Sequence, residues 1–446
     1  MHNEAVIENN NNRPTQVSSQ QHSLLLAAIV CILGAMFYLY EFVLQVSPSV
    51  MTTELMRDLN LNAASLGAMA AFYYYAYTPM QLPAGLLYDR FGPRILITVA
   101  ILICASGAFF FGLTDNVALA SAGRFFMGIG SAFSFIGALL LVSRWFPAHY
   151  FALLAGIVQF MSSVGAICGQ VPLATAVAKW GWRSNIMWIA FIGVILAVLV
   201  WLVIRDYPPS VRAEKAAEAS KKKPTELFRL RKVCGNKQTW LIALYSFAVW
   251  APIAAFAALW GVPFLVAAYG ISTAAAAKLC SLIWIGIGIG SPLIGWWSEH
   301  MGRRCLPLIT AAVIGICSLL SILYIPHLPM PILYTLMFFF GLAATGQSLA
   351  FAVVKDNNDS DVTGTAIGLN NMAVVAGGAI FQPLVGIILH AHWSGVTNSG
   401  APVYSASDYH MALAVLPVCY IIAVIVGSKF LRETFCQHYT SIKRSA

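Results

Sequence analysis

Glu41 and Arg124 are charged residues that stand inside long apolar stretches of this chain. A charge in the apolar part of a membrane is costly, so such a residue marks a proton, ion or solute site by default. Counted from Pro48 and from Val117, where the two stretches are expected to reach the same side of the membrane, each charge is about seven residues deep. That depth is ~10 Å at the rise of a helix. We therefore expect the carboxylate and the guanidinium to face one central space.

The Glu41 and Arg124 side chains allow three kinds of chemistry. They can form an ion pair that holds two helices together, because a buried charge needs a partner. They can instead bind the opposite charges of a zwitterionic or anionic solute. Alternatively, Glu41 can exchange a proton, with its protonation set by whether Arg124 or solute lies beside it.

Polar and aromatic side chains continue the helix face that carries Glu41. Tyr38, Glu41 and Gln45 are spaced by three or four residues, which places them on one side of a helix and away from lipid. Uncharged polar or aromatic residues recur in the other apolar stretches. They complete the predicted solute site: Tyr73, Tyr77, Gln159, Gln170, Tyr245, Trp250, Gln347, Asn370 and Asn371.

The elements that must position these side chains are membrane-spanning helices. The 446 residues are 59% apolar and 10% charged, with a mean hydropathy of +0.76, which is typical of an integral membrane protein. A spanning helix needs about 20 mostly apolar residues. A membrane β-barrel would instead show segments of about ten residues with period-two alternation, which the sequence lacks. The sequence thus predicts an all-α integral membrane protein with twelve transmembrane helices, at about 23–47, 63–88, 95–113, 117–141, 151–177, 184–205, 238–266, 274–298, 305–325, 331–354, 362–390 and 409–430.

The basic residues divide the chain and predict its orientation. A basic segment of low hydropathy at 206–237 separates an N-terminal six-helix bundle at 23–205 from a C-terminal one at 238–430. Residues 1–22 are predicted as a disordered tail and 431–446 as a second tail. With both termini in the cytoplasm, 21 of the 26 Lys and Arg residues are cytoplasmic, as the positive-inside rule requires. This placement accounts for the net charge of +9 without a nucleic-acid partner.

A charged loop between the second and third predicted helices has a weaker copy in the second half. Residues 85–94, with the sequence Gly-Leu-Leu-Tyr-Asp-Arg-Phe-Gly-Pro-Arg, are repeated 210 positions later at 295–304. We expect Asp89 to sit against the positive end of the eleventh helix and to act as a latch. Asp356, Asp359 and Asp361 are further candidates to pair with Arg90 or Arg94 of the first loop, although exposed pairs contribute little. The gating candidates are Gly85, Asp89, Arg90, Gly92 and Arg94, together with Gly295, Glu299, Gly302, Arg303 and Arg304.

The repeat extends from these loops into the helices. Arg124 and Gly128 in the fourth helix correspond to Met337 and Gly341 in the tenth, at a displacement of 213 residues. The fifth and eleventh helices share a Gly, Gly, Gln pattern at a displacement of 212. A duplicated six-helix unit is common in secondary transporters. Because Met337 is the counterpart of Arg124, packing of this motif does not require a charge. We therefore expect Glu41 and Arg124 to serve solute binding and proton coupling.

The chain resembles the major facilitator superfamily of secondary transporters. The loop at 85–94 is similar to the signature of that family between helices 2 and 3, and Arg124-x-x-x-Gly128 is similar to its helix 4 motif. Gly165 and Gly169 resemble part of its helix 5 motif, and we expect them to let helix 5 lie closely against the opposite half. The resemblance implies two pseudo-symmetric six-helix bundles that face each other, with helices 1, 4, 7 and 10 lining a solute path.

These features predict a secondary transporter that moves a small polar organic solute by alternating access, with the proton as a candidate co-substrate. An amino acid, a short peptide or a small carboxylate suits the mixed charge of Glu41 and Arg124. The sequence has no nucleotide-binding loop and no catalytic or metal-ligand spacing, so we expect no enzyme activity, cofactor or metal. An organic-anion symporter, an exporter of a drug or a siderophore, and a transporter-like membrane sensor remain as alternatives.

The predicted class also indicates where the protein resides. Its nine cysteines are scattered without a disulfide framework. Its Asn-x-Ser/Thr sequence, which begins at Asn358, falls on the predicted cytoplasmic side. We expect a monomeric multi-pass protein of a bacterial inner membrane with both termini in the cytoplasm.

Overall fold

The computed structural model describes residues 13–147, 150–208, 226–359 and 362–437. Both chain ends and most of the predicted linker at 206–237 lie outside the described residues. The first half is formed by α1 (Arg13–Val46), η1 (Ser47–Val50), α2 (Thr52–Asp58), α3 (Ala63–Leu113), α4 (Val117–Ser131), α5 (Ser134–Trp145), α6 (Phe151–Cys168), α7 (Val171–Trp180) and α8 (Trp182–Val203).

The second half repeats this order of helices and adds a short hairpin. It is formed by α10 (Glu226–Cys234), α11 (Lys237–Pro252), η3 (Ile253–Trp260), α12 (Gly261–Tyr269), α13 (Thr273–Met301), α14 (Cys305–Tyr324), α15 (Met330–Ala343), α16 (Gly346–Asn357), α17 (Thr363–Ala391), β1 (Thr397–Asn398), β2 (Ala401–Pro402), α18 (Ala406–Leu413), α19 (Val415–Ile425) and η4 (Val426–Phe430). The described chain thus begins its first helix at Arg13, within the predicted tail.

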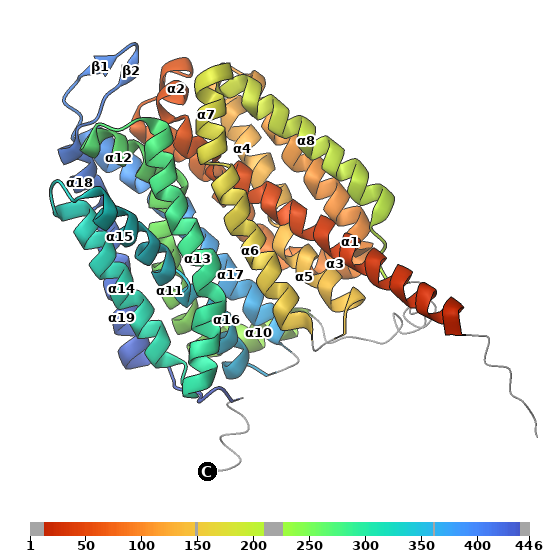
Figure 1. Cartoon of the computed structure of the whole chain (residues 1–446). Coiled ribbons are helices and arrows are strands. Elements are labelled where there is room, and N and C mark those ends of the chain that lie inside the picture. The colour runs from red at the N-terminus through yellow and green to blue at the C-terminus, as the bar shows by residue number, and fades with distance from the viewer. Residues whose placement is uncertain (1–12, 148–149, 209–225, 360–361, 438–446) are drawn as a thin grey trace, which may run out of the picture.

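Figure 1 shows the helices as two bundles, with the first half in red to yellow and the second in green to blue. The antiparallel β1–β2 hairpin lies at one end of the molecule, which we call the hairpin end. The helix α10 and the end of η4 lie at the opposite end, which we call the linker end. The helices α3 and α17 pack along each other and join the two bundles.

Eleven helical segments of the described residues are long and apolar enough to cross a membrane, one fewer than the twelve predicted helices. The segment that is not among them is the first part of α3, residues 63–89. Three tyrosines at 73–75 and the prolines Pro79 and Pro83 lower its hydropathy. This part of α3 is helical and ends in a bend at Gly92, so α3 supplies two crossings. The all-α architecture of twelve helices in two bundles is therefore confirmed.

The two bundles share a break at the same place. The fourth crossing is interrupted between α4 and α5 at Ala132 and Phe133. The tenth crossing is interrupted between α15 and α16 at Ala344 and Thr345, 212 residues later. A break in a spanning helix leaves backbone groups that only buried protein surroundings can satisfy. Both breaks are buried, as this requirement predicts.

Two glycines of the repeat bring helix backbones together. A Cβ atom on Gly128 of α4 would collide with the carbonyl oxygen of Tyr73 in α3. A Cβ atom on Gly341 of α15 would collide with the carbonyl oxygen of Ile283 in α13, which is 210 residues after Tyr73. Small residues permit such close helix packing in membranes. The glycine of the Arg124-x-x-x-Gly128 motif therefore has a packing role.

The glycines of α6 pack within the first bundle. Gly165 lies against the carbonyl group of Leu39, and Gly169 lies against Val43 and Val46, all of which belong to α1. The prediction that these glycines let the fifth crossing approach the opposite half is therefore wrong. The reason is that α1 is the close neighbour of α6.

Polar side chains fix where the main helices begin. Asn62 accepts a hydrogen bond from the N–H of Ser65 in a capping box at the start of α3. Asn116, Asn236 and Ser272 cap α4, α11 and α13 in the same way. Each cap satisfies N–H groups that have no partner inside the helix. The polar residues between the apolar runs thus set the helix boundaries.

Candidate functional site

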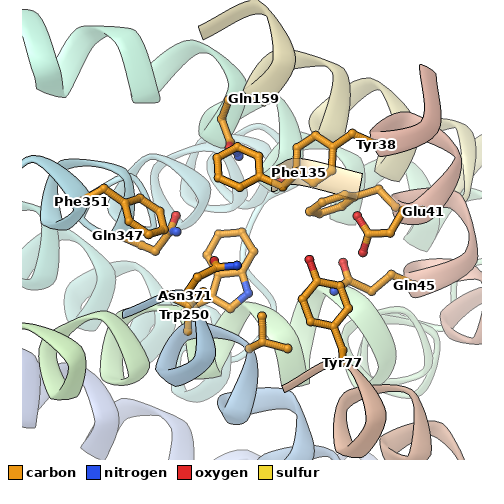
Figure 2. Close-up of a pocket in the computed structure, with 13 residues that line it drawn as sticks. Tyr38, Glu41, Gln45, Tyr77, Phe135, Gln159, Trp250, Gln347, Phe351 and Asn371 are labelled. Atoms are coloured by element: carbon orange, nitrogen blue, oxygen red, sulfur yellow. The ribbon is translucent and has the colours of Figure 1, made fainter. Parts of the chain in front are cut away.

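A narrow central cavity lies between the two bundles. Its volume is about 30 Å³, which is room for one or two water molecules. Figure 2 shows Glu41 and Gln45 on one side of the cavity and Gln347 and Trp250 on the other. The cavity is lined by Tyr38, Glu41, Phe42, Gln45, Tyr77, Phe135 and Gln159 of the first half, and by Trp250, Gln347, Phe351, Asn371, Val374 and Val375 of the second.

The Glu41 carboxylate has a hydrogen bond on one oxygen only. Its residue is 1% exposed, and the Tyr73 hydroxyl donates to Oε1 at 2.5 Å. Oε2 is buried and has no hydrogen-bond partner. A buried carboxylate oxygen without a partner is costly. This oxygen is therefore available to a proton or to a donor that enters the cavity.

Arg124 lies behind Tyr73 and does not line the cavity. Its guanidinium carbon is 4.8 Å from the centre of the Tyr73 ring, and Nη1 donates to the Leu44 carbonyl oxygen at 2.8 Å. Its Nε and Nη2 atoms have no hydrogen-bond partner. No ion pair joins the described side chains of Arg124 and Glu41, so the interpretation as a structural ion pair is wrong. Tyr73 stands between the two charges, with its hydroxyl on the carboxylate and its ring against the guanidinium.

The cavity brings together eight of the thirteen predicted solute-binding residues: Tyr38, Glu41, Gln45, Tyr77, Gln159, Trp250, Gln347 and Asn371. The other five are buried outside its lining: Tyr73, Arg124, Gln170, Tyr245 and Asn370. Tyr245 donates to the Leu308 carbonyl oxygen at 2.7 Å, and Asn370 accepts from Ser246 at 2.9 Å. These two residues therefore hold helices of the second bundle together.

Five apolar residues complete the lining and are absent from the predicted set: Phe42, Phe135, Phe351, Val374 and Val375. An apolar residue of a spanning helix can face lipid, the protein interior or a cavity, and its type does not distinguish these places. The sequence therefore carries no signal for these five. Among the described residues, no group of His, Cys, Asp and Glu is arranged to hold a metal ion.

At the hairpin end, hydrogen bonds join the two bundles. Gln170 of the first half donates to the Ala257 carbonyl oxygen at 2.8 Å and accepts from the Ser281 hydroxyl at 3.3 Å. Gln382, its counterpart in the repeat, lies 3.4 Å from the Tyr74 hydroxyl of α3. All five of these residues are at most 4% exposed, so solvent is excluded from this contact and we describe the hairpin end as closed.

At the linker end, a larger cavity of about 580 Å³ lies between α3 and α5 of the first half and α17 of the second, with α10 beside it. Phe135 and Asn371 line both this cavity and the central one. Asn371 donates to Gln81 Oε1 at 2.6 Å, and the rings of Phe135 and Phe351 are 6.4 Å apart. We call these four side chains, Gln81, Phe135, Phe351 and Asn371, the inner partition.

The first charged loop is held to its own bundle. Gly92 has a φ of +76°, which favours glycine, and a Cβ atom there would collide with the Asp206 carboxylate. Asp206 accepts from the Arg94 N–H at 2.9 Å. The Arg94 guanidinium donates to the Trp201 carbonyl oxygen at 2.8 Å, and its central carbon lies 4.3 Å from the centre of the Trp201 ring. The side chain of Asp89 lies outside the described residues, so its latch on α17 stays a prediction.

Gly85, another gating candidate of this loop, borders the space between the bundles. Gly85 lines the linker-end cavity together with Gly364 and Thr365 at the start of α17. The Arg90 guanidinium lies 5.1 Å from the centre of the neighbouring Phe91 ring. The loop and the start of α17 thus face each other across the cavity.

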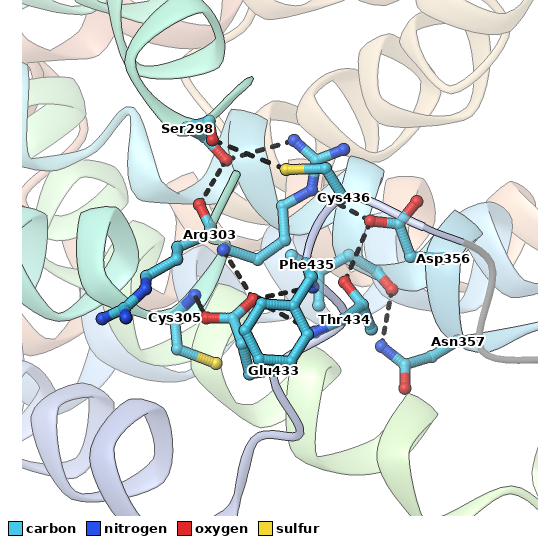
Figure 3. A network of polar contacts seen from close by, with 11 residues as sticks. Ser298, Arg303, Cys305, Asp356, Asn357, Glu433, Thr434, Phe435 and Cys436 are labelled. Carbon is cyan, nitrogen blue, oxygen red and sulfur yellow. Dashed lines mark hydrogen bonds and ion pairs between the residues drawn. The ribbon is translucent and has the colours of Figure 1, made fainter. Parts of the chain in front are cut away.

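The second charged loop is also held to its own bundle, by the network of polar contacts drawn in Figure 3. Arg304 is 7% exposed, and its Nε donates to Asp356 Oδ2 at 2.9 Å. Glu433 accepts from the N–H groups of Arg304 and Cys305 at 2.8 and 2.9 Å, which caps the start of α14. Partial burial acts to raise the pKa of Glu433, but four backbone N–H groups outweigh it and hold that pKa below its usual value.

The other members of this loop end α13. Gly302 adopts a left-handed conformation, with a φ of +62°, and its N–H donates to the Glu299 carbonyl oxygen at 3.1 Å. The carbonyl oxygen of Arg303 accepts from the Ser298 hydroxyl at 2.8 Å. Gly295 has open space where a Cβ atom would stand.

Asp356, in the last turn of α16, and Asp359, just after that helix, do not reach the first loop. Asp356 binds Arg304 in the second loop, and Asp359 pairs with Lys232 of α10 at 3.0 Å. The prediction that Asp356 and Asp359 pair with Arg90 or Arg94 is therefore wrong, and Asp361 lies outside the described residues. Both acids belong to the second bundle and find basic partners nearer to them.

The sequence profile described as the Major Facilitator Superfamily matches residues 24–383 of the chain. The probable galactarate/D-glucarate transporter GarP of Escherichia coli (strain K12) is 23% identical over 408 residues, which cover 84% of this chain and 89% of GarP. The gentisate transporter of Corynebacterium glutamicum is 23% identical, with 87% of this chain and 86% of that protein covered. The lysosomal dipeptide transporter MFSD1 of Danio rerio is 24% identical, with 67% of this chain and 66% of MFSD1 covered.

Solved structures show the same fold. A bacterial homolog of the human lysosomal transporter Spinster, in an inward-facing and unoccupied conformation, has a TM-score of 0.70 at 17% identity and covers 94% of this chain and 98% of its own. A D-xylose-proton symporter has a TM-score of 0.69 at 15% identity and covers 93% and 99%. The chain therefore belongs to the major facilitator superfamily, whose members are secondary transporters and not enzymes.

Proposed function

We propose that this protein carries a small polar organic solute across the membrane, with an amino acid, a short peptide or a small carboxylate as the cargo classes. The observation that carries the proposal is the central cavity, which both bundles line with polar and aromatic side chains around one buried carboxylate. Sites of this kind, between inverted or parallel repeats, are where secondary transporters bind their cargo. The relatives named for galactarate or D-glucarate, gentisate and dipeptides fall within these cargo classes.

Transport through this site requires the bundles to move. The central cavity holds only one or two water molecules, so an organic cargo enters when the bundles separate at one end. The closed hairpin end and the thin inner partition support a cycle in which the two ends open in turn. Cargo shifts the equilibrium between these states by the difference between its affinities for them.

We propose further that Glu41 couples this cycle to protons. A proton on Glu41 removes the negative charge and converts a carboxylate oxygen into a donor. Tyr73 contacts both Glu41 and Arg124. We therefore propose that Arg124 acts on Glu41 through Tyr73 and not by direct contact with cargo. Cargo and proton then compete for, or share, the Oε2 atom that has no partner.

The first charged loop is proposed as a gate at the linker end. Its Gly85 faces the start of α17 across the linker-end cavity, where an acidic side chain such as Asp89 would meet the positive end of that helix. Such a contact is worth about 0.3–1 kcal/mol when exposed and up to ~2 kcal/mol when partly buried. Asp89→Asn should slow transport severalfold and leave membrane insertion intact. Transport at the wild-type rate by Asp89→Asn would refute the latch.

The proposed organisation follows the charge distribution. Bundles at 23–205 and 238–430 are joined by a basic linker at 206–237, and the tails are 1–22 and 431–446. The positive-inside rule supports a cytoplasmic linker end in a bacterial inner membrane. We propose that one chain forms the complete transport unit, because both walls of the cavity come from the same chain.

Counterflow into proteoliposomes tests the function. Vesicles are loaded with one unlabelled solute at a time from a panel of amino acids, dipeptides and sugar acids, and entry of the labelled form is followed. We expect at least one solute to accumulate transiently, and an imposed pH gradient to change its uptake. Glu41→Gln should abolish the pH response, whereas Glu54→Gln, on the half-exposed α2, should retain it. If the folded protein moves no solute of the panel, or if Glu41→Gln keeps both rate and pH response, the proposal fails.

A further inference from the structure

The lining of the central cavity contains a single charged side chain. That side chain is Glu41, and none of the thirteen lining residues is Lys, Arg or His. Arg124 is 1% exposed, and its guanidinium lies against the Tyr73 ring rather than in the cavity. An anion in this cavity would therefore meet a carboxylate with no side-chain cation in the lining to offset the repulsion.

Two acceptor atoms on one wall of the cavity have no partner. They are Glu41 Oε2 and Gln45 Oε1, which belong to residues 1% and 6% exposed and one helical turn apart on α1. Buried acceptors in this state favour a guest that brings donors. An ammonium group has three donors and no acceptor, and its bond to a carboxylate is charge-assisted. The unsatisfied wall thus matches an ammonium group in both charge and hydrogen bonding.

Aromatic rings form much of the remaining surface. The Tyr38 ring is 5.1 Å from the Phe42 ring in an edge-to-face arrangement and 5.2 Å from the Phe135 ring. Phe351 reaches Phe135 from the second half, and Trp250 lies on the same side as Phe351. The faces of aromatic rings attract cations, most strongly where water is excluded, and aromatic cages recognise ammonium groups for this reason.

The opposite wall is polar but neutral. Gln347 and Asn371 line it. The Asn371 side-chain amide donates an N–H to Gln81, so the Asn371 carbonyl oxygen is left for other contacts. Neutral amides can bind a hydroxyl, an amide or a carboxylate of the cargo without a strong preference for charge. The charge preference of the cavity is therefore set on the Glu41 side.

We infer that the central cavity is an ammonium-binding site, so that the cargo carries a protonated amine whose charge is balanced by Glu41 between aromatic walls. This inference rests on the proposed transport function and narrows its cargo to amino acids, peptides and simple amines. Carboxylates that lack an amine are disfavoured. In this respect the chain differs from what the names of its relatives GarP and the gentisate transporter state for those proteins.

Binding of matched probes to the purified full-length protein in lipid nanodiscs tests the inference. One set keeps a single carbon skeleton: L-leucine carries amine and carboxylate, 3-methylbutylamine the amine alone, and 4-methylpentanoate the carboxylate alone. L-alanyl-L-alanine is compared with its N-acetyl derivative, and D-glucarate is a dicarboxylate probe. Affinities come from tryptophan fluorescence and from thermal stabilisation. We expect each amine-bearing probe that fits to bind at least tenfold more tightly than its amine-free partner.

Substitution of the carboxylate localises the preference. Glu41→Gln keeps the shape of the side chain and removes its charge, so the amine preference should disappear, whereas Glu54→Gln should keep it. The wild-type comparison decides the matter on its own if Glu41→Gln does not fold. The inference is overturned if D-glucarate or 4-methylpentanoate binds as tightly as the amine probes, if no amine probe binds, or if Glu41→Gln retains the preference.

Counterflow separates this outcome from a failure of the proposed function. Movement of D-glucarate without amine-dependent binding would keep the transporter and overturn the ammonium site. An absence of counterflow with every probe, in protein that is folded in the vesicles, would instead contradict the transport function itself.

Discussion

The central cavity is closed in different ways at its two ends. At the hairpin end, backbone is packed directly against backbone across the bundles: a Cβ atom on Gly67 or on Gly386 would collide with the carbonyl oxygen of Gln382 or of Ala63. Side-chain hydrogen bonds, such as the one between Gln170 and Ser281, add to these backbone contacts. At the linker end, the inner partition joins side chain to side chain, through Gln81 and Asn371 and through Phe135 and Phe351. A rotamer change is a local motion of one side chain, whereas packed backbones separate only when helices or domains move, in microseconds to milliseconds. The linker end can therefore open locally, but the hairpin end opens only when whole helices move.

The largest expected effect comes from a methyl group at the hairpin end. A Cβ atom on Gly67 of α3 would lie 2.5 Å from the carbonyl oxygen of Gln382 in α17, so Gly67→Ala opposes closure of this end. Overpacking costs about 1–3 kcal/mol, and a shift of that size is roughly 5- to 150-fold. The rate of counterflow should fall by a similar factor, and thiol-reactive probes should label the hairpin end faster.

Gly156 of α6 provides the control for this substitution. A Cβ atom at Gly156 would have no neighbouring heavy atom within 4 Å. Gly156→Ala should therefore leave the rate of counterflow close to that of the wild type. A wild-type rate in Gly67→Ala would show that the hairpin end does not depend on this backbone contact.

Gln170→Ala should have the next largest effect. It removes the hydrogen bonds to Ala257 and Ser281 and leaves a buried carbonyl oxygen without its donor. The loss is about 1–2 kcal/mol, or roughly 5- to 30-fold toward the state open at the hairpin end. Thiol accessibility of a cysteine introduced at Thr273 measures this shift. Thr175→Ala, at the same end but bonded only to Pro172, is the control, and equal accessibility in the two variants would contradict the account.

A single hydrogen bond at the rim should contribute less. Asn62 binds Ser65 with its Oδ1, which directs its amide N–H toward His390 Nε2 at 3.3 Å. His390→Phe removes this acceptor between the bundles but keeps a ring beside Trp393, and should shift the same accessibility by about 0.5–1.5 kcal/mol. His392→Phe changes an exposed neighbour and should have no effect. An equal change of accessibility in both variants would show that the hydrogen bond between Asn62 and His390 does not stabilise closure of the hairpin end.

The smallest effect on the two ends is expected from Glu433→Gln, because Glu433 acts within the second bundle. Its lowered pKa means that its stabilisation is present above its ordinary pKa and is lost as the pH falls through the folded value. The variant should be less stable than the wild type by about 0.3–1 kcal/mol at neutral pH, with the difference vanishing in acid. Thermal unfolding across pH measures this, and the exposed Glu299→Gln is the control. A difference that persists in acid would assign the role to packing instead of charge.

Much of the fold could be predicted from hydropathy and from the internal repeat. The repeat is physically expressed in the paired contacts of Gly128 and Gly341, which explains why those glycines recur. The second crossing, at the start of α3, could be predicted from the sequence pattern although its tyrosines lower its hydropathy. The helix that Gly165 packs against could not be predicted, because a glycine pattern indicates a close neighbour without identifying the neighbouring helix.

The candidate site was predicted in part. Periodicity on α1 grouped Tyr38, Glu41 and Gln45, and all three line the cavity. Equal depth suggested that Glu41 and Arg124 meet, but depth gives no information about rotation of α4. The position of Tyr73 between them follows from tertiary packing alone.

Two acidic residues, Asp206 and Glu433, occupy matching places in the two halves. Asp206 and Glu433 each follow the last helix of a bundle, and each accepts from the backbone N–H of a loop arginine, Arg94 or Arg304. Their equivalent places in the two halves could have identified them as caps of the two charged loops. The spacing differs from that of the other repeated motifs, so a fixed displacement does not reveal the match.

Distance measurement between spin labels tests the central claim most directly, namely that one site is reached in turn from two ends. Labels at Lys179 and Thr273 report the hairpin end, and labels at Ser143 and Lys355 report the linker end, all at exposed positions on opposite bundles. In nanodiscs, each pair should show a short and a long distance. The Gly67→Ala background should lengthen the hairpin-end distance and shorten the linker-end distance together. A single unchanged distance at both ends, in the wild type, in Gly67→Ala and with transported solute, would contradict alternating access in this protein.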